Sequence, residues 1–322
     1  MPRQRRFAFA TLLTLSPLLL GGGSNAQDFP NKPVRLVVAS SPGSTSDLVA
    51  RVVGPELGKA LGQPVIVDNK PGAGQIIGLE YVARQAPADG YALAVPTVEG
   101  LALLPLLTKD LRFDPIRELP ITAMLAEGRL VLGSSVKMPW KTFSEFVAHA
   151  RANPGKLNYG TSSAALRVTT AAVTRELGLE VVHIPYSAGG PYIQALAAGQ
   201  IDFGVAGVAS AVSMGERFRV LTVSGSQRRP PYLEVPTFTE LKLPPLRGTS
   251  YSINARAGTP RPVLDRLHAA ATRVLQQPEV KTSLANIQLE PVMESIETSA
   301  RGLADLFTLY TDTVRKAGIQ PE

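Results

Sequence analysis

Two short segments rich in serine and threonine each stand between an apolar run and a helix-like pattern. The first is Ser40–Asp47, with four serines, one threonine and one glycine, and the second is Thr161–Ser163. Where such a segment precedes a helix, its hydroxyls and backbone N–H groups lie at the positive end of the helix dipole, which suits a carboxylate. Each segment alone is more simply explained as a helix cap. One such segment in each half of the chain favours the binding of a small anion.

A third segment, Pro71–Gly74, places two glycines around Ala73. Glycines let backbone approach a ligand closely or simply make a tight turn, and the residues leave both readings open. The segment lacks the lysine of a phosphate-binding loop and the third glycine of a dinucleotide fingerprint. It therefore gives no support for nucleotide binding.

The chain offers no recognisable catalytic or metal-binding set. It has no cysteine, which excludes disulfides, thiolate metal sites, a cysteine nucleophile and a lipid-anchored N-terminus. Its histidines, His149, His183 and His268, show no metal-ligand spacing, and His183 in its apolar run is expected to be structural. No Gly-x-Ser-x-Gly motif marks a hydrolase nucleophile. We therefore expect no catalytic residues, cofactor or metal, with a secreted hydrolase as the weaker alternative.

The N-terminus has the pattern of a cleavable secretory signal over residues 1–26. Basic Arg3, Arg5 and Arg6 precede the apolar run Phe7–Leu20 and a small-residue site at 24–26. A membrane anchor is the alternative, but this run has about 14 residues where a span needs about 20. These arginines also supply three charges of the formal net charge of +7, and the rest of the chain has no basic stripe typical of nucleic-acid binders. We expect an exported, periplasmic protein that binds no nucleic acid.

Strand-like and helix-like patterns alternate along the remaining chain. This alternation predicts a mainly parallel α/β sheet with helices on both faces, and the pattern restarts after about residue 129, which predicts two such units. The expected strands are 34–39, 65–68, 92–95, 130–133, 157–159, 181–184 and 201–205. The first expected helix runs from just after Asp47 to Leu61. The other expected helices cover 76–84, 143–151, 166–177, 193–198, 260–276 and 296–317. In such sheets, ligands bind beyond the carboxyl ends of the strands, where the hydroxyl-rich segments stand.

Several longer segments resemble the Bug family of extracytoplasmic solute receptors, the binding components of tripartite tricarboxylate transporters. The likeness covers nearly the whole chain after the signal, in the family's order and spacing. The segments that carry it are FPNKPVR at 29–35, LGQPVIVDNKPGAG at 61–74, ADGY at 88–91, PGKLNYG at 154–160, HIPY at 183–186, GQID at 199–202 and AGTP at 257–260.

This resemblance implies a type II periplasmic binding protein fold, with two doubly wound α/β lobes joined by a two-crossing hinge. The crossings are expected near 124–132 and 248–256. The first lobe then contains residues 27–128 and 252–322, and the second contains residues 129–251.

The resemblance also implies a ligand site between the lobes. Its first wall is the loop after the first strand, with help from the glycine turn, and its second wall comes from the other lobe. The expected ligand-binding residues are Pro42, Gly43, Ser44, Thr45, Ser46, Asp47, Gly72, Ala73, Gly74, Thr97, Thr161, Ser162, Ser163, Arg167, Tyr186 and Asp202.

Departures from the family pattern bear on the ligand. Ser44–Ser46 makes the first loop bulkier and richer in hydroxyls than the usual glycine-rich version. Arg167 stands near the place of a frequent histidine, either as a fixed charge for a second carboxylate or as a solvated helix residue. Ala206 and Gly207 stand where a second aspartate is common, which favours a plain dicarboxylate or aromatic carboxylate over an amino acid.

Together these features predict a monomeric receptor that captures a di- or tricarboxylate or an aromatic carboxylate for membrane permease subunits. A receptor that presents its closed form to a sensor kinase is the alternative, because both roles use the same closure.

Overall fold

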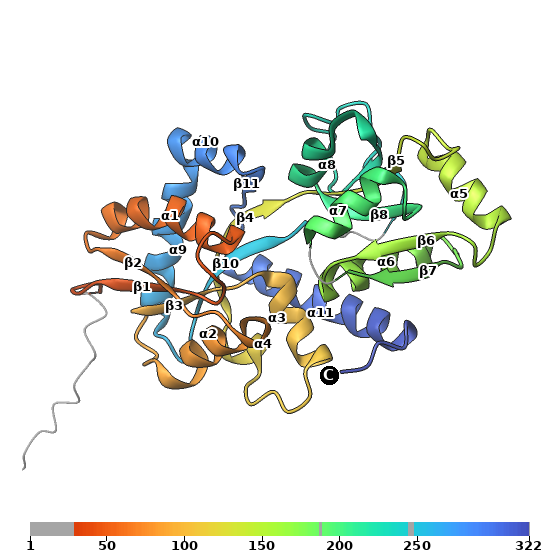
Figure 1. The fold of residues 1–322 in the computed structure, drawn as a ribbon. Helices are drawn as coiled ribbons and strands as arrows, with labels where there is room; N and C mark the ends of the chain where they lie inside the picture. The colour runs from red at the N-terminus through yellow and green to blue at the C-terminus, as the bar shows by residue number, and fades with distance from the viewer. Residues whose placement is uncertain (1–28, 187–188, 244–247, 322) are drawn as a thin grey trace, which may run out of the picture.

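The computed structural model describes residues 29–186, 189–243 and 248–321, which form two mixed sheets with helices on both faces (Figure 1). The expected signal segment lies outside these residues. The chain enters the second sheet once and returns once, so the first sheet contains strands from both ends of the described chain.

The first sheet has the order β11-β4-β10-β3-β1-β2. β1 pairs in parallel with β2 and β3, whereas β10 and β11 run antiparallel to their neighbours. Its strands are β1 (Val34–Val38), β2 (Val65–Asn69), β3 (Ala92–Val95), β4 (Ile121–Gly128), β10 (Ser250–Ala255) and β11 (Leu289–Pro291).

The second sheet has the order β7-β6-β8-β5-β9. β6 pairs in parallel with β7 and β8, whereas β5 runs antiparallel to β8 and β9. Its strands are β5 (Leu130–Ser135), β6 (Asn158–Thr161), β7 (Val182–Pro185), β8 (Phe203–Gly207) and β9 (Phe218–Val223).

The central strands are buried on both faces, which explains their nearly continuous apolar sequences. In β1, Leu36 and Val38 face one cluster of buried side chains and Val37 faces another. The first-sheet helices are α1 (Thr45–Leu61), α2 (Ile76–Glu80), α3 (Val98–Leu107), α4 (Pro115–Glu118), α9 (Arg261–Gln276), α10 (Pro278–Asn286) and α11 (Ile296–Lys316). The second-sheet helices are α5 (Phe143–Ala152), α6 (Ala164–Glu176), α7 (Gly189–Ala198) and α8 (Val208–Met214).

Two neighbouring passages connect the sheets. The first runs from β4 to β5 through Arg129 alone, and the second ends where β10 begins. The passages lie against each other, since Gly128 donates its N–H to Thr249 O at 2.9 Å and a Cβ on Gly248 would overlap the Gly128 carbonyl. We propose the lobe division indicated by the sequence, at residues 128/129 and 251/252.

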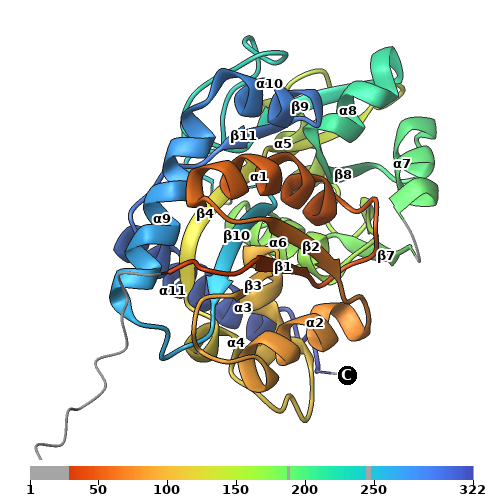
Figure 2. The same cartoon turned by 90° about the vertical axis from the view of Figure 1, so that its left-hand side faces the viewer.

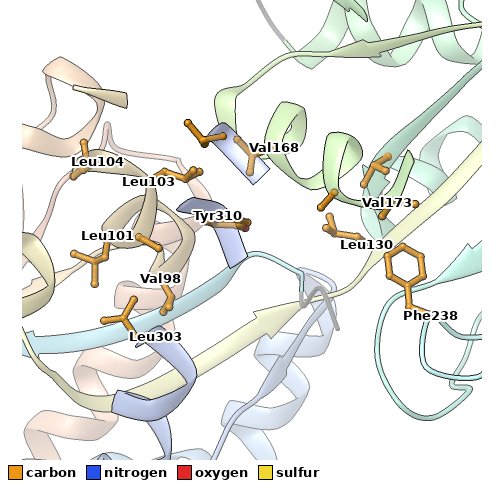
Figure 3. Packing of buried hydrophobic residues seen from close by; sticks show 14 of the residues in the cluster. Val98, Leu101, Leu103, Leu104, Leu130, Val168, Val173, Phe238, Leu303 and Tyr310 are labelled. Atoms are coloured by element: carbon orange, nitrogen blue, oxygen red, sulfur yellow. The ribbon is translucent and has the colours of Figure 1, made fainter. Parts of the chain in front are cut away.

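A continuous apolar core also joins the lobes through three helices. Side chains of α3, α11 and α6 meet around Tyr310, with Leu103 and Val168 on either side (Figure 3). At the rim of this contact, Arg175 Nη2 of α6 lies 3.1 Å from Asp312 Oδ2 of α11. The lobes therefore touch on the side of α11 as well as through the passages.

Two expectations about the fold need correction. The sheets are mixed rather than mainly parallel, because the strands that leave and return run side by side in opposite directions. Secondly, the sequence pattern does not indicate every element: it misses β4, β9, β10, β11, α3, α4, α8 and α10. The helix α3 was missed because its sequence, VEGLALLPLL, is apolar almost all round. It packs against α11, α6 and β10, and a helix buried on several sides has no alternating polar face.

Candidate ligand-binding site

The loop between β1 and α1 is held by its own side chains. Ser44 caps α1 by accepting the Asp47 N–H at 3.3 Å, and its Oγ lies 2.8 Å from Ser40 Oγ. Pro42, Gly43 and Thr45 remain exposed at the N-terminal end of α1. The loop therefore presents backbone and the side chains of Ser41 and Thr45 to solvent, while the hydroxyls of Ser40 and Ser44 stabilise the turn.

Asp47 points into the protein, with only 1% of its surface exposed. Its carboxylate accepts hydrogen bonds from Gly43 N at 2.9 Å, Asn69 Nδ2 at 3.0 Å and Arg51 Nε at 2.9 Å. The Arg51 hydrogen bond is the main cause of the lowered pKa of this carboxyl. Asp47 thus fixes the loop to α1 and to the end of β2, and the neighbouring Ser46 is buried as well.

The glycine turn after β2 forms the next part of this wall. Ala73 and Gln75, like Gly72 and Gly74, have positive φ angles, which ordinary side chains rarely adopt. Gln75 holds the turn by donating to Thr97 Oγ1 at 3.1 Å and accepting the Thr97 N–H at 3.3 Å. Backbone strain held in place by specific partners is typical of functional sites.

Thr97 connects this turn to the helix behind it, because its Oγ1 also accepts the Gly100 N–H and caps α3. The β1 loop, the glycine turn and Thr97 follow β1, β2 and β3, which run in parallel and end at the same edge of the first sheet (Figure 2). The structure thus brings all expected first-lobe residues to one edge, with Ser46 and Asp47 turned inward.

Five of the six expected second-lobe residues, all except Asp202, line one pocket of about 320 Å³. Thr161 ends β6 and bonds to His183 on β7, with 2.7 Å between Oγ1 and Nε2. Ser163 caps α6, and Arg167 lies one turn further along this helix. The lining is Leu107, Thr161, Ser162, Ser163, Ala164, Arg167, Val168, His183, Pro185, Tyr186, Ile319 and Gln320.

This pocket carries positive charge. Among the described residues, no acidic side chain lines it and no carboxylate forms an ion pair with Arg167. Burial lowers the pKa of His183, and the nearby Arg167 guanidinium lowers it further. At neutral pH the pocket therefore offers one fixed positive charge, a neutral imidazole and several hydroxyls.

Asp202 lies elsewhere. Its carboxylate accepts the Asn158 N–H at 2.7 Å, at the beginning of β6, whereas Thr161 ends that strand. The structure therefore does not bring Asp202 to the pocket with Thr161, Arg167 and Tyr186, and instead gives it a bond between neighbouring strands.

The two walls remain separate in this conformation, since the first-lobe loops do not line the pocket. Its other side is closed by Leu107 of α3 and by Ile319 and Gln320 after α11. Sequence reasoning missed these residues, as well as His183 and Gln75. His183 begins the quoted HIPY segment and Gln75 directly follows the quoted segment at 61–74, but their hydrogen bonds join residues 22 positions apart.

Comparison with known proteins identifies the family. A model of the tripartite tricarboxylate transporter family receptors matches residues 49–318, a range that includes the whole proposed second lobe and most of the first. The chain belongs to this family. This match confirms the resemblance inferred from the sequence. Members of the tripartite tricarboxylate transporter receptor family are binding proteins rather than enzymes.

Among curated proteins, this receptor is 33% identical to the "UPF0065 protein in gbd 5'region" of Cupriavidus necator, over 92% of this chain and 90% of that one. The two chains are therefore similar along nearly their whole lengths.

Solved structures confirm the type II periplasmic binding protein fold. A structure described as a periplasmic transporter is 31% identical, with a TM-score of 0.73 over 91% of this chain and 99% of that one. R. palustris Rpa4515 with adipate is 26% identical, with a TM-score of 0.73 and coverage of 92% and 100%. MatC from Rhodopseudomonas palustris with bound malate is 28% identical, with a TM-score of 0.69 and coverage of 89% and 100%.

Neither a membrane-spanning helix nor a metal-binding cluster occurs within residues 29–186, 189–243 and 248–321. No helix in these ranges is both long and apolar enough to cross a membrane. The same residues contain no group of three or more histidine, aspartate or glutamate side chains able to hold a metal ion.

Proposed function

We propose that this receptor captures a small organic carboxylate in the periplasm, between its two lobes, and presents it to the permease subunits of a tripartite tricarboxylate transporter. The supporting observation is the position of Arg167, whose guanidinium has no carboxylate partner among the described residues, in a pocket that also holds Thr161, Ser162 and Ser163. Two relatives of known structure hold adipate and malate, both small dicarboxylates.

The second-lobe pocket holds one carboxylate of the ligand in this proposal. Arg167 forms charge-assisted hydrogen bonds with it, and the hydroxyls and the N-terminus of α6 complete the contact. An ammonium group would find no acidic acceptor among the described lining residues. A dicarboxylate, tricarboxylate or aromatic carboxylate therefore fits better than an amino acid.

The other wall contacts the ligand after closure. The exposed backbone of Gly43, the Thr45 hydroxyl and the glycine turn face a second carboxylate or an aromatic ring edge, with ordered water filling gaps. A ligand that touches both walls favours the conformer in which both are close, and this differential affinity drives closure.

Isothermal titration calorimetry on residues 27–322 tests this proposal, with adipate, malate, citrate and benzoate as probes. Arg167→Gln removes the fixed charge and is expected to weaken the best ligand about 30-fold, on the order of 2 kcal/mol for a charge-assisted bond. Its melting temperature should change little, because Arg167 is only half-buried and forms no ion pair with a described carboxylate.

Arg266→Gln is the matched control, since it removes the same charge from an exposed position on α9. Its affinity should equal that of the unaltered receptor. If Arg167→Gln and Arg266→Gln bind the ligand with equal affinity, the placement of the carboxylate at Arg167 is wrong. If none of the four anions produces binding heat, the proposed ligand class is wrong.

A further inference from the structure

A second cavity, distinct from the ligand-binding pocket, lies beside the passages between the lobes. Its volume is about 330 Å³, and α3, β4, β10 and α11 surround it. Most of its wall is apolar, including Val98, Leu303 and Tyr310, which lie close together in Figure 3. Gly302 and Asp305 of α11 also line it and are exposed, so the cavity opens to solvent on that side.

One carboxyl group lies within this apolar wall. Glu99 belongs to the first turn of α3, its residue is 8% exposed, and its Oε2 accepts the Ser250 N–H at 2.9 Å. No arginine, lysine or histidine occurs among the described residues that line the cavity. Within the described lining, the carboxyl therefore has a hydrogen-bond donor but no cation.

Among the described residues, the titratable groups that act on Glu99 from neighbouring elements are acidic or phenolic. Glu127 of β4 lies near enough to oppose its ionisation, and the other titratable neighbours are the phenols of Tyr251 on β10 and Tyr310 on α11. Burial is the largest effect, and it raises the pKa of Glu99 to about 7. Further out, Glu294 and Asp305 also line the cavity.

We propose that this cavity is a second small-molecule site, for an organic ammonium ion with a compact apolar body, whose charged head pairs with Glu99. The apolar wall receives the hydrocarbon part, and the carboxylate receives the N–H donors of the head group. The cavity is opposite in charge to the Arg167 pocket, so the two sites select opposite classes of ligand. This inference does not depend on the proposed carboxylate function.

Binding at this site is coupled to proton release. The ammonium ion pairs with the ionised form of Glu99, so each binding event below pH 7 displaces the proton that the empty site holds. Alkylamines stay protonated well above this range, like lysine. With a pKa of about 7 for Glu99, affinity should rise about tenfold from pH 6 to pH 8, with most of the rise below pH 7.

Calorimetry with cyclohexylamine as the probe, on residues 27–322, tests the site. Titrations at pH 6, 7 and 8 should show the tenfold rise, and buffers with different ionisation enthalpies should reveal proton release at pH 6 that fades by pH 8. Cyclohexanol has the same apolar body without the charge, and it should bind at least tenfold more weakly at pH 8.

Glu99→Gln keeps an acceptor for the Ser250 N–H but cannot ionise, so it should bind cyclohexylamine at least tenfold more weakly and without pH dependence. Glu176→Gln, at an exposed position on α6, is the matched control and should bind like the unaltered receptor. Absence of amine binding, equal binding of cyclohexanol, or full pH-dependent binding by Glu99→Gln would each overturn the proposal. If Glu99→Gln does not fold, the comparison of amine with alcohol and the pH series still decide it.

Discussion

The β1 loop and the β6 loop share one sequence signature but differ in how their polar groups are used. Both place serine and threonine before a helix, and in both a serine caps that helix, Ser44 in one and Ser163 in the other. In the β1 loop a buried carboxylate, Asp47, collects three hydrogen bonds from the loop and its neighbours. In the β6 loop the charged residue is Arg167, and no described carboxylate neutralises it.

This difference separates positioning from binding. A charge whose partners lie within the protein contributes to the shape of the loop, and its loss alters the stability of the folded chain. A charge without an internal partner is available to a ligand, and its loss alters affinity instead. The two walls of one site can therefore be distinguished by which measured quantity each substitution changes.

The largest effect on stability is expected from Asp47→Asn, which removes the ion pair with Arg51 and the acceptor for the Gly43 N–H. The free energy of unfolding should fall by about 2 kcal/mol, because the buried carboxylate and its charge-assisted hydrogen bonds are lost. Glu56→Gln, which breaks the exposed pair with Lys59 on the same helix, should cost less than about 0.5 kcal/mol. Urea denaturation of both variants provides the measurement.

The pH dependence of stability gives the same comparison a second readout. The pKa of Asp47 is lower in the folded state than in the unfolded chain, so the unfolded chain binds the proton first as pH falls. The contribution of Asp47 to the free energy of unfolding is therefore complete at pH values above its ordinary pKa. It is lost as the pH falls through the lowered pKa of the folded state. Asp47→Asn should lack this acid-dependent component, and an unchanged acid profile in the variant would contradict the positioning role.

The sequence predicted most of the secondary structure because strands and helices here have clear boundaries. The pattern from Val34 to Leu61, for example, matches β1 and α1 closely. It failed where tertiary packing overrides periodicity. The chain from Val98 to Leu107 is buried on several sides and has no polar face, and β4 and β10 owe their antiparallel pairing to the return of the chain from the other lobe.

The candidate site was predictable to the level of segments but not of side chains. The hydroxyl-rich pattern located Thr161–Ser163 and the family likeness added Arg167, and the structure gathers them in one pocket. It could not indicate that Asp202 bonds to Asn158, because that contact joins residues 44 positions apart. The tail residues Ile319 and Gln320 also reach the pocket only through the packing of α11 between the lobes.

A smaller effect is expected from Gln75→Ala, which tests whether the glycine turn is a positioning element like Asp47. The substitution removes both hydrogen bonds to Thr97 and should lower the free energy of unfolding by about 1 kcal/mol. Ligand affinity should also fall, because the turn loses the contacts that hold its positive φ angles. Gln85→Ala, at an exposed position after α2, is the control. If Gln75→Ala and Gln85→Ala bind the ligand with equal affinity, the turn has no specific role in binding.

The smallest effect concerns the titration of His183 in the second-lobe pocket. Its pKa is lowered first by burial and then by Arg167, so Arg167→Gln should raise the midpoint only part of the way towards the ordinary value of about 6.5. A bound carboxylate should raise it in the unaltered receptor, because an anion beside the imidazole favours its protonated form. Side-chain NMR of the three histidines measures both shifts, with Arg266→Gln as the unaffected control. A midpoint that moves with neither the substitution nor the ligand would mean that Arg167 and the bound anion lie too far from His183 to form one site. Arg167 could then no longer be contrasted with Asp47 as a charge available to the ligand.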